Sequence, residues 1–367
     1  VLAVVAITIV AIAPTILGIQ LRRATAPYDF AFDGLIQLEE AVKFLLDGTN
    51  PYATTYEGTP LAEWPLAGPN PAENPPVFHL IQLPFVYLFW VPFYLLAEAT
   101  IGWFDGRFVL LALFLIMLDL LRRLAPTGPR ARAVMLAIGL NPWLAPFLAE
   151  GRNDVSVLFW VVLTVFLLHR GRRTLSVVTL ALASAGKLTT WFILPFYAFY
   201  FLYPERHRID WRWPDFYTRL RKALPHLLLF LVVFSAVILP FFLWDPAAFV
   251  EDIVLFPAGR TERTFPIIGI GFARLALEAG WHPDAYVPFP ALPFQLLFGI
   301  PALLVGWRWQ ARRNNIGTLL LAGGALGLVV GFFAHIFHAN HFGFYVSLLV
   351  MGWLLHYREG QIGQTTA

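Results

Sequence analysis

Long apolar runs recur along almost the whole chain, and they constrain its fold more than any other feature. These runs are roughly 14–22 residues long and are separated by short polar segments. A helix that crosses the hydrocarbon core of a bilayer, about 30 Å thick, needs about 20 such residues. Of the 367 residues, 58% are hydrophobic and only 13% are charged. This composition excludes a soluble globular protein and predicts an all-α, polytopic integral membrane protein.

Basic residues predict the orientation of the helices, because short loops rich in Lys and Arg stay on the cytoplasmic side. Arg358 and four short segments hold 17 of the 26 basic residues, the segments being 122–132, 170–173, 205–222 and 308–313. Acidic residues gather elsewhere, with 16 of 23 in 26–76, 150–154, 245–262 and 278–284. We therefore expect two large extracytoplasmic loops with amphipathic helices, 23–76 and 245–290.

The remaining segments predict about ten crossings within a single domain, 1–367. The crossings are 1–21, 105–121, 133–149, 154–169, 174–187, 189–203, 224–244, 291–308, 315–334 and 342–357. Segment 77–98 is predicted to be a re-entrant or broken helix that Pro84 and Pro92 interrupt. Asn141-Pro142 predicts a helix break before the turn 150–154. Because the chain starts with Val1 inside an apolar run, we expect that the natural N-terminus is missing.

The stretch 26–52 is the first place where carboxylates gather. Asp29, Asp33, Gln37 and Glu40 recur at helical spacing, so we expect one face of a short helix to carry acids and an amide. One interpretation is an amphipathic helix with solvated acids on the membrane surface. The other is a catalytic carboxylate presented at that surface.

Several basic residues indicate an anionic ligand. Lys187 lies between two apolar stretches, where a lysine faces a cavity or an anionic partner, or extends toward the membrane surface from a helix end. Arg260 and Arg263 lie in the second outer loop, against the positive-inside pattern. They are either solvated or bind phosphate oxygens.

His335, His338 and His341 are spaced by three, a pattern that favours hydrogen bonding to a phosphate or sugar or packing at the membrane interface. Metal binding is less expected, because no acid lies near them in sequence. The chain has no cysteine, which excludes disulfides and thiolate chemistry. It also lacks a P-loop, GxGxxG, GxSxG or HExxH motif in a suitable setting, which argues against nucleotide-driven and zinc-hydrolase chemistry.

Four motifs follow one another along the chain in a characteristic order. After the outer aspartate come DGTNPY (47–52), NPPVFH (74–79), LNPWLAPFLAEGRNDV (140–155) and SAGKLTTWFILP (184–195). This arrangement resembles the GT-C superfamily of membrane glycosyltransferases over most of the chain. Within that superfamily, it is similar to the polyprenol-phosphate-mannose-dependent α-1,2-mannosyltransferases that build phosphatidylinositol mannosides.

The resemblance implies inverting transfer of a sugar, mannose in the family, from a polyprenyl-phosphate-linked donor to a lipid-linked or glycan acceptor. The reaction would occur at the extracytoplasmic face of the plasma membrane, among membrane lipids and without nucleic acid. By its spacing to Gly48, Asp33 would be the general base, with Asp29 as the alternative. The two acids are four residues apart, unlike the DxD pattern of some relatives. No metal ligand is therefore assigned, and a divalent cation stays open as a cofactor.

The resemblance and the residue types together give two sets of candidate binding residues. The donor phosphate would be bound by Lys187, Arg260, Arg263, His335, His338 and His341. The acceptor or the sugar would be bound by Gln37, Glu40, Tyr52, His79, Arg152, Asn153 and Asp154.

Two other functions remain open. A lipid or solute transporter or flippase would use Lys187 and the histidines along a pathway, although the chain shows no internal repeat of the kind that transporters have. A non-catalytic assembly partner is the third hypothesis.

Overall fold

The computed structural model describes residues 2–65, 74–124, 129–203 and 213–365. Over these ranges the protein is all-helical without β-strands, and one isolated bridge pairs Gly269 with Phe337. Parts of the predicted loop 23–76 and of the basic segments 122–132 and 205–222 lie outside the described residues.

The first half of the chain begins with one continuous helical segment, Leu2–Ala24. Its elements are α1 (Leu2–Ile7), η1 (Thr8–Ile12), α2 (Ala13–Ala24), α3 (Asp33–Leu46), η2 (Pro60–Glu63), η3 (Pro75–Val77), α4 (Phe85–Ile101), α5 (Arg107–Leu124), α6 (Pro129–Gly139), α7 (Ala145–Glu150), α8 (Asp154–His169) and α9 (Arg173–Ser184).

The second half contains the longest helices. Its elements are η4 (Leu188–Ile193), α10 (Leu194–Leu202), α11 (Trp213–Trp244), α12 (Pro246–Val250), η5 (Glu251–Leu255), α13 (Phe272–Glu278), α14 (Ala291–Arg312), α15 (Ile316–Phe332) and α16 (Ala339–Thr365).

Three helices of the described chain are long and apolar enough to cross a membrane, namely Leu2–Ala24, Phe216–Trp244 and Ala291–Arg312. Six further apolar helices are shorter, namely Phe85–Ile101, Asp154–His169, Arg173–Ser184, Leu188–Leu202, Ile316–Phe332 and Ala339–Leu355. The all-helical fold with apolar helices is therefore as expected, whereas the count of ten crossings stays a prediction.

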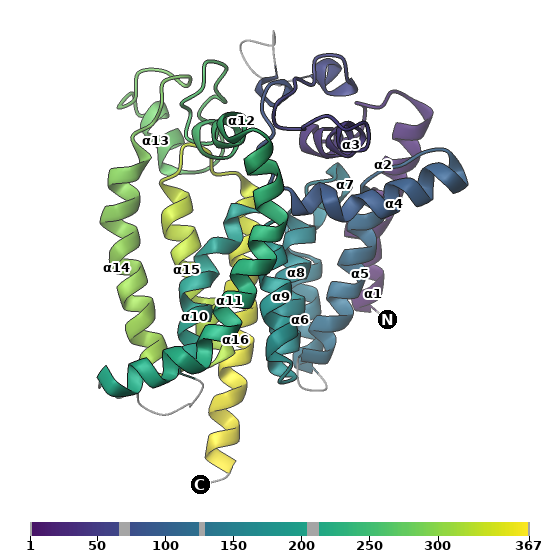
Figure 1. Cartoon of the computed structure of the whole chain (residues 1–367). Coiled ribbons are helices and arrows are strands. Elements are labelled where there is room, and N and C mark those ends of the chain that lie inside the picture. The colour runs from purple at the N-terminus through teal and green to yellow at the C-terminus, as the bar shows by residue number, and fades with distance from the viewer. Residues whose placement is uncertain (1, 66–73, 125–128, 204–212, 366–367) are drawn as a thin grey trace.

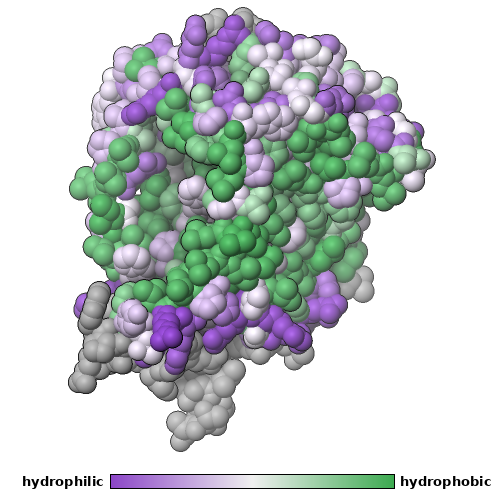
Figure 2. All heavy atoms as spheres, in the orientation of Figure 1, coloured by the Kyte–Doolittle hydropathy of each residue, from purple (hydrophilic) through white to green (hydrophobic). Residues whose placement is uncertain are grey.

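The helices form a bundle with two different ends. Figure 1 shows α3, α12 and α13 gathered at one end, while the C-terminus lies beyond the other. In Figure 2, a broad hydrophobic band separates two hydrophilic ends, as expected for a bundle surrounded by lipid. The segments around α3 and 245–290 thus share one end.

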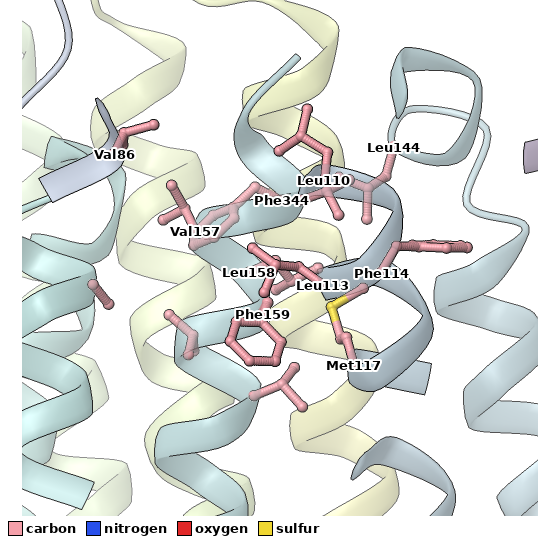
Figure 3. Close-up of a cluster of buried hydrophobic side chains, with 14 of the residues drawn as sticks. Val86, Leu110, Leu113, Phe114, Met117, Leu144, Val157, Leu158, Phe159 and Phe344 are labelled. Carbon is pink, nitrogen blue, oxygen red and sulfur yellow. The ribbon is translucent and has the colours of Figure 1, made fainter. Parts of the chain in front are cut away.

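The core lies where α5, α8 and α16 meet. Leu113, Met117, Leu158 and Phe344 are among the buried side chains there, and Figure 3 shows them interlocking between the helices. The same cluster of buried side chains includes Leu35, Ile36 and Leu38, so it continues to the segment 33–46 at one end of the bundle.

The prediction for segment 77–98 is confirmed at Pro84 and wrong at Pro92. Pro84 immediately precedes α4, and Pro92 lies inside it without ending the helix. Figure 1 shows α4 lying across the end of the bundle as one continuous helix beneath α3. In contrast, the predicted break at Asn141-Pro142 is present, because α6 ends at Gly139 and α7 starts at Ala145.

Helix α3 differs from the expected amphipathic surface helix. It begins at Asp33, so Asp29 is not part of it. Every residue from Leu35 to Val42 is buried, because α3 packs against α4, η2 and η3. The acids of α3 are therefore inside the protein, and their burial requires partners.

Candidate functional site

A cavity of about 270 Å³ lies beside the N-terminal turn of α3. Its lining comes from that turn, from the α7–α8 turn, from η4 and from the segment between α15 and α16. The polar part of the lining includes Asp33, Gln37, Arg152, Asn153, Asp154, Lys187, His338, Asn340 and His341. Segments that are up to about 300 residues apart in sequence thus meet at one site.

Asp33 is the first residue of α3, and only 4% of its surface is exposed. Its Oδ1 accepts a hydrogen bond of 2.6 Å from the backbone N–H of Gly34. Burial raises the pKa of Asp33 to about 6, against the opposing effects of the Gly34 N–H, the Arg152 charge and the Asn74 side chain. A carboxylate with such a pKa is suited to accept a proton near neutral pH.

The turn between α7 and α8 fixes the start of α3. The Phe32 N–H donates to the Glu150 carbonyl at 2.8 Å, and the Arg152 guanidinium lies 3.9 Å from the centroid of the Phe32 ring. Gly151 has a φ of +87°, and a Cβ there would lie 2.5 Å from the Leu35 side chain. Glycine therefore permits the close approach that brings Arg152 toward Asp33.

A buried network of four charges holds the segment before α3. Arg22 pairs with Glu39 at 2.7 Å and with Asp105 at 3.0 Å, and Arg107 pairs with Asp105 at 2.7 Å. Arg22 Nε also donates to the Pro27 carbonyl at 2.6 Å. The two positive and two negative charges balance within the network, as burial of charge demands.

Arg107 is fully buried and clamps three backbone segments. It donates to the carbonyls of Phe30 at 2.7 Å, Ala149 at 2.9 Å and Gly18 at 3.3 Å. Phe30 has a φ of +54°, a strained conformation for a residue other than glycine. The clamp stabilises this strained turn three residues before Asp33.

Besides Asp33, the lining contains a connected set of polar side chains. Lys187 Nζ donates to Asp154 Oδ1 at 2.8 Å and to Asn153 Oδ1 at 3.0 Å. Asn340 Nδ2 donates to Asp154 Oδ2 at 2.5 Å, and Arg152 donates to Asn340 Oδ1 at 3.2 Å. Lys187 is mostly buried, with 13% of its side chain exposed. This wall presents cationic N–H donors to the cavity.

The ion pairs distinguish Asp33 from the other buried acids. Six carboxylates are buried among the residues that the structure describes, and five of them pair with a basic side chain, namely Glu39 with Arg22, Glu40 with Lys43, Asp105 with Arg107, Asp154 with Lys187 and Asp252 with His79. Asp33 is the sixth, and within the described part of the chain no ion pair involves it.

The structure brings eight sequence candidates to the cavity, namely Asp33, Gln37, Arg152, Asn153, Asp154, Lys187, His338 and His341. The other seven do not line it. Asp29 is half-buried in the turn before α3, and Glu40 pairs with Lys43 at 2.6 Å. Tyr52 is a core residue whose hydroxyl donates to the Gln82 carbonyl at 2.7 Å.

The remaining four have structural contacts or exposed positions. His79 Nδ1 lies 2.9 Å from Asp252 Oδ1, and Arg260 is exposed. The Arg263 guanidinium lies 3.7 Å from the centroid of the Phe78 ring. His335 is buried, and its two ring nitrogens bond with the Phe265 carbonyl at 2.9 Å and the Phe289 N–H at 3.3 Å. The spacing of three therefore does not give the three histidines a common ligand.

Asn340 and Gln82 are polar residues of the cavity lining that were not expected from the sequence. Asn340 links Arg152 and Asp154, and Gln82 accepts from Asn153 at 2.8 Å. The sequence feature that could have indicated them is a polar amide side chain within an apolar segment. Asn340, in addition, lies between His338 and His341. Among the described residues, no group of three or more His, Asp or Glu side chains is placed to hold a metal ion.

Comparison of the chain with family models finds no match, and a search of curated proteins finds none either.

Proposed function

We propose that this protein is an inverting membrane glycosyltransferase of GT-C type that uses a polyprenyl-phosphate-linked sugar. The observation that carries the proposal is the pairing pattern of the buried acids, because among the residues that the structure describes Asp33 is the buried acid without a basic side chain at ion-pair distance. Asp33 also shares the lining of one cavity with Lys187 and Arg152. A general base and cations for a phosphate leaving group thus share one site, as sugar transfer requires.

The residues account for each part of the reaction. Asp33 accepts the proton of an acceptor hydroxyl as the hydroxyl oxygen bonds to the anomeric carbon. The bond from that carbon to the phosphate oxygen breaks, and the polyprenyl phosphate leaves with the electron pair. Lys187 has three N–H donors, of which two are used by Asn153 and Asp154, so one remains for the phosphate. Inversion follows from attack opposite the leaving group.

The lipid part of the donor needs an apolar path. Leu188, Phe192, Val330 and Ile336 line the cavity on the side of η4 and α15, and Figure 2 shows the hydrophobic band hollowed beside α14. This hollow suits an isoprenoid chain that arrives from the bilayer. The proposal includes about ten crossings in the plasma membrane and a cavity on the extracytoplasmic side, where the acidic loops are expected.

Transfer by the purified chain in detergent tests the proposal. The donor is a polyprenyl phosphate that carries [³H]mannose, the acceptors are octyl α-mannoside and phosphatidylinositol mannosides, and the product is separated by chromatography. We expect wild-type transfer, the same rate in the surface variant Asp47→Asn, and a loss of about 100-fold or more in Asp33→Asn.

The alternatives predict different results. Full activity of Asp33→Asn together with inactive Asp29→Asn would move the base to Asp29. Absence of transfer, with flux of the lipid across proteoliposomes instead, would favour the transporter. Normal transfer by a partner protein when both aspartates are replaced would favour an assembly role.

A further inference from the structure

The side-chain amide of Gln37 has a fixed orientation. Its Nε2 donates to the Pro76 carbonyl at 2.6 Å and to the His79 carbonyl at 2.8 Å. Both partners are acceptors only, so the nitrogen must face them, whichever way an amide is first placed. The two hydrogens of the amide are therefore used, and the atom left over is the oxygen.

That oxygen is an unused hydrogen-bond acceptor in the cavity. Gln37 lines the cavity with 1% of its surface exposed. Among the described residues, no hydrogen bond to Gln37 Oε1 is found. An acceptor that faces the cavity without a protein partner is open to a donor group on a ligand, which gains affinity from the hydrogen bond.

Gln37 and Asp33 present acceptors on the same helix face. They are four residues apart on α3, a spacing that places side chains next to each other, with Cβ atoms about 5–6 Å apart. Asp33 Oδ1 accepts from Gly34, and because a carboxylate has about four lone-pair sites, acceptor capacity remains for a ligand. The α3 wall thus offers two neighbouring acceptors, while the wall with Lys187 offers donors.

We propose that Gln37 Oε1 accepts a hydrogen bond from the hydroxyl next to the nucleophilic hydroxyl, so that the acceptor substrate is a vicinal diol, as in a sugar or another polyol. This inference rests on the proposed transfer reaction. The nucleophilic hydroxyl donates to Asp33, and its neighbour on the same molecule donates to Gln37. Gln37 binds and orients the acceptor and takes no proton from it.

A double-mutant-type cycle, in which a change in the protein is combined with a change in the acceptor substrate, tests the inference. Octyl α-mannoside and its monodeoxy derivatives are compared as acceptors for wild type, Gln37→Met and the control Asp47→Asn, with the [³H]mannosyl polyprenyl phosphate donor. In wild type and Asp47→Asn, removal of the hydroxyl next to the nucleophile should lower kcat/KM by about tenfold. In Gln37→Met, the same removal should change kcat/KM by less than about twofold.

The cycle separates binding from a structural role. Gln37→Met also loses the two bonds to the η3 segment, but that loss affects every acceptor equally and leaves the discrimination between acceptors unchanged. Equal discrimination in wild type and Gln37→Met would therefore overturn the role of Gln37 alone. Absence of transfer to every acceptor by the wild type would overturn the proposed function and this inference with it.

Discussion

Asp33→Asn should stabilise the protein while it abolishes transfer. Burial raises the pKa of Asp33 from 3.8 to about 6, so the folded state binds this proton more tightly than the unfolded state. The contribution to stability is complete below pH 3.8 and is lost as the pH rises through about 6. Above that pH the buried carboxylate is ionised without an ionic partner.

The pKa difference sets the magnitude. At about 1.4 kcal/mol per pKa unit, the rise from 3.8 to about 6 corresponds to about 3 kcal/mol of lost stability at pH 8. The neutral amide of Asn has nearly the same shape and does not titrate. The variant should therefore gain up to about 3 kcal/mol over wild type at pH 8 and only about 1 kcal/mol at pH 4.5, where the folded carboxyl is still protonated.

Thermal unfolding in detergent measures this effect. The melting temperatures of wild type, Asp33→Asn and Asp47→Asn are followed by intrinsic fluorescence at pH 4.5 and pH 8. Asp47 is exposed at the end of α3, so its variant should match wild type at both pH values. If Asp33→Asn gains no stability at pH 8 relative to pH 4.5, the assignment of a raised pKa to Asp33 is wrong.

Three further predictions concern the surroundings of Asp33. Lys187→Met leaves Asp154 buried and unpaired, so it should destabilise the fold by about 3–5 kcal/mol. The double variant Lys187→Met/Asp154→Asn should recover most of this stability without recovering transfer. Equal melting temperatures of the single and double variants would contradict the pairing. Arg107→Lys cannot make all the bonds of the guanidinium and should cost about 3 kcal/mol or more in thermal unfolding, whereas an unchanged melting temperature would show that the clamp is dispensable. Asp252→Asn weakens the contact to His79, so the backbone amides of 245–265 should exchange hydrogen faster in mass spectrometry, and unchanged exchange would refute this link between the segments around His79 and Asp252.

Much of the helical architecture could be predicted from the sequence, because apolar periodicity and proline position are local signals. Helix α8 spans Asp154–His169, as the pattern indicates, and the break at Asn141-Pro142 follows from the same local chemistry. The course of α4 could not be predicted. Pro92 inside an apolar run indicates an interruption, but packing beneath α3 keeps the helix continuous across the bundle.

The site was only partly predictable, because residue type does not reveal burial. Arg152 and Arg260 are both arginines in expected outer segments, yet Arg152 lines the cavity and Arg260 is exposed. The acids of α3 likewise depend on distant partners. Arg22 lies 17 residues from Glu39 and 83 from Asp105, and no spacing rule along one helix connects them.

The choice between Asp29 and Asp33 shows what the structure adds. Spacing to Gly48 favours Asp33 in sequence, but spacing carries no physical reason for reactivity. The structure offers one, because Glu39 and Asp154 each form an ion pair, with Arg22 and Lys187 respectively. A carboxylate in an ion pair loses that pair when it accepts a proton, whereas Asp33 forms no ion pair and is relieved of the desolvation of its buried charge. Among the buried acids in the described part of the chain, Asp33 is therefore the one that can take a proton from a substrate without breaking a pair with a basic side chain.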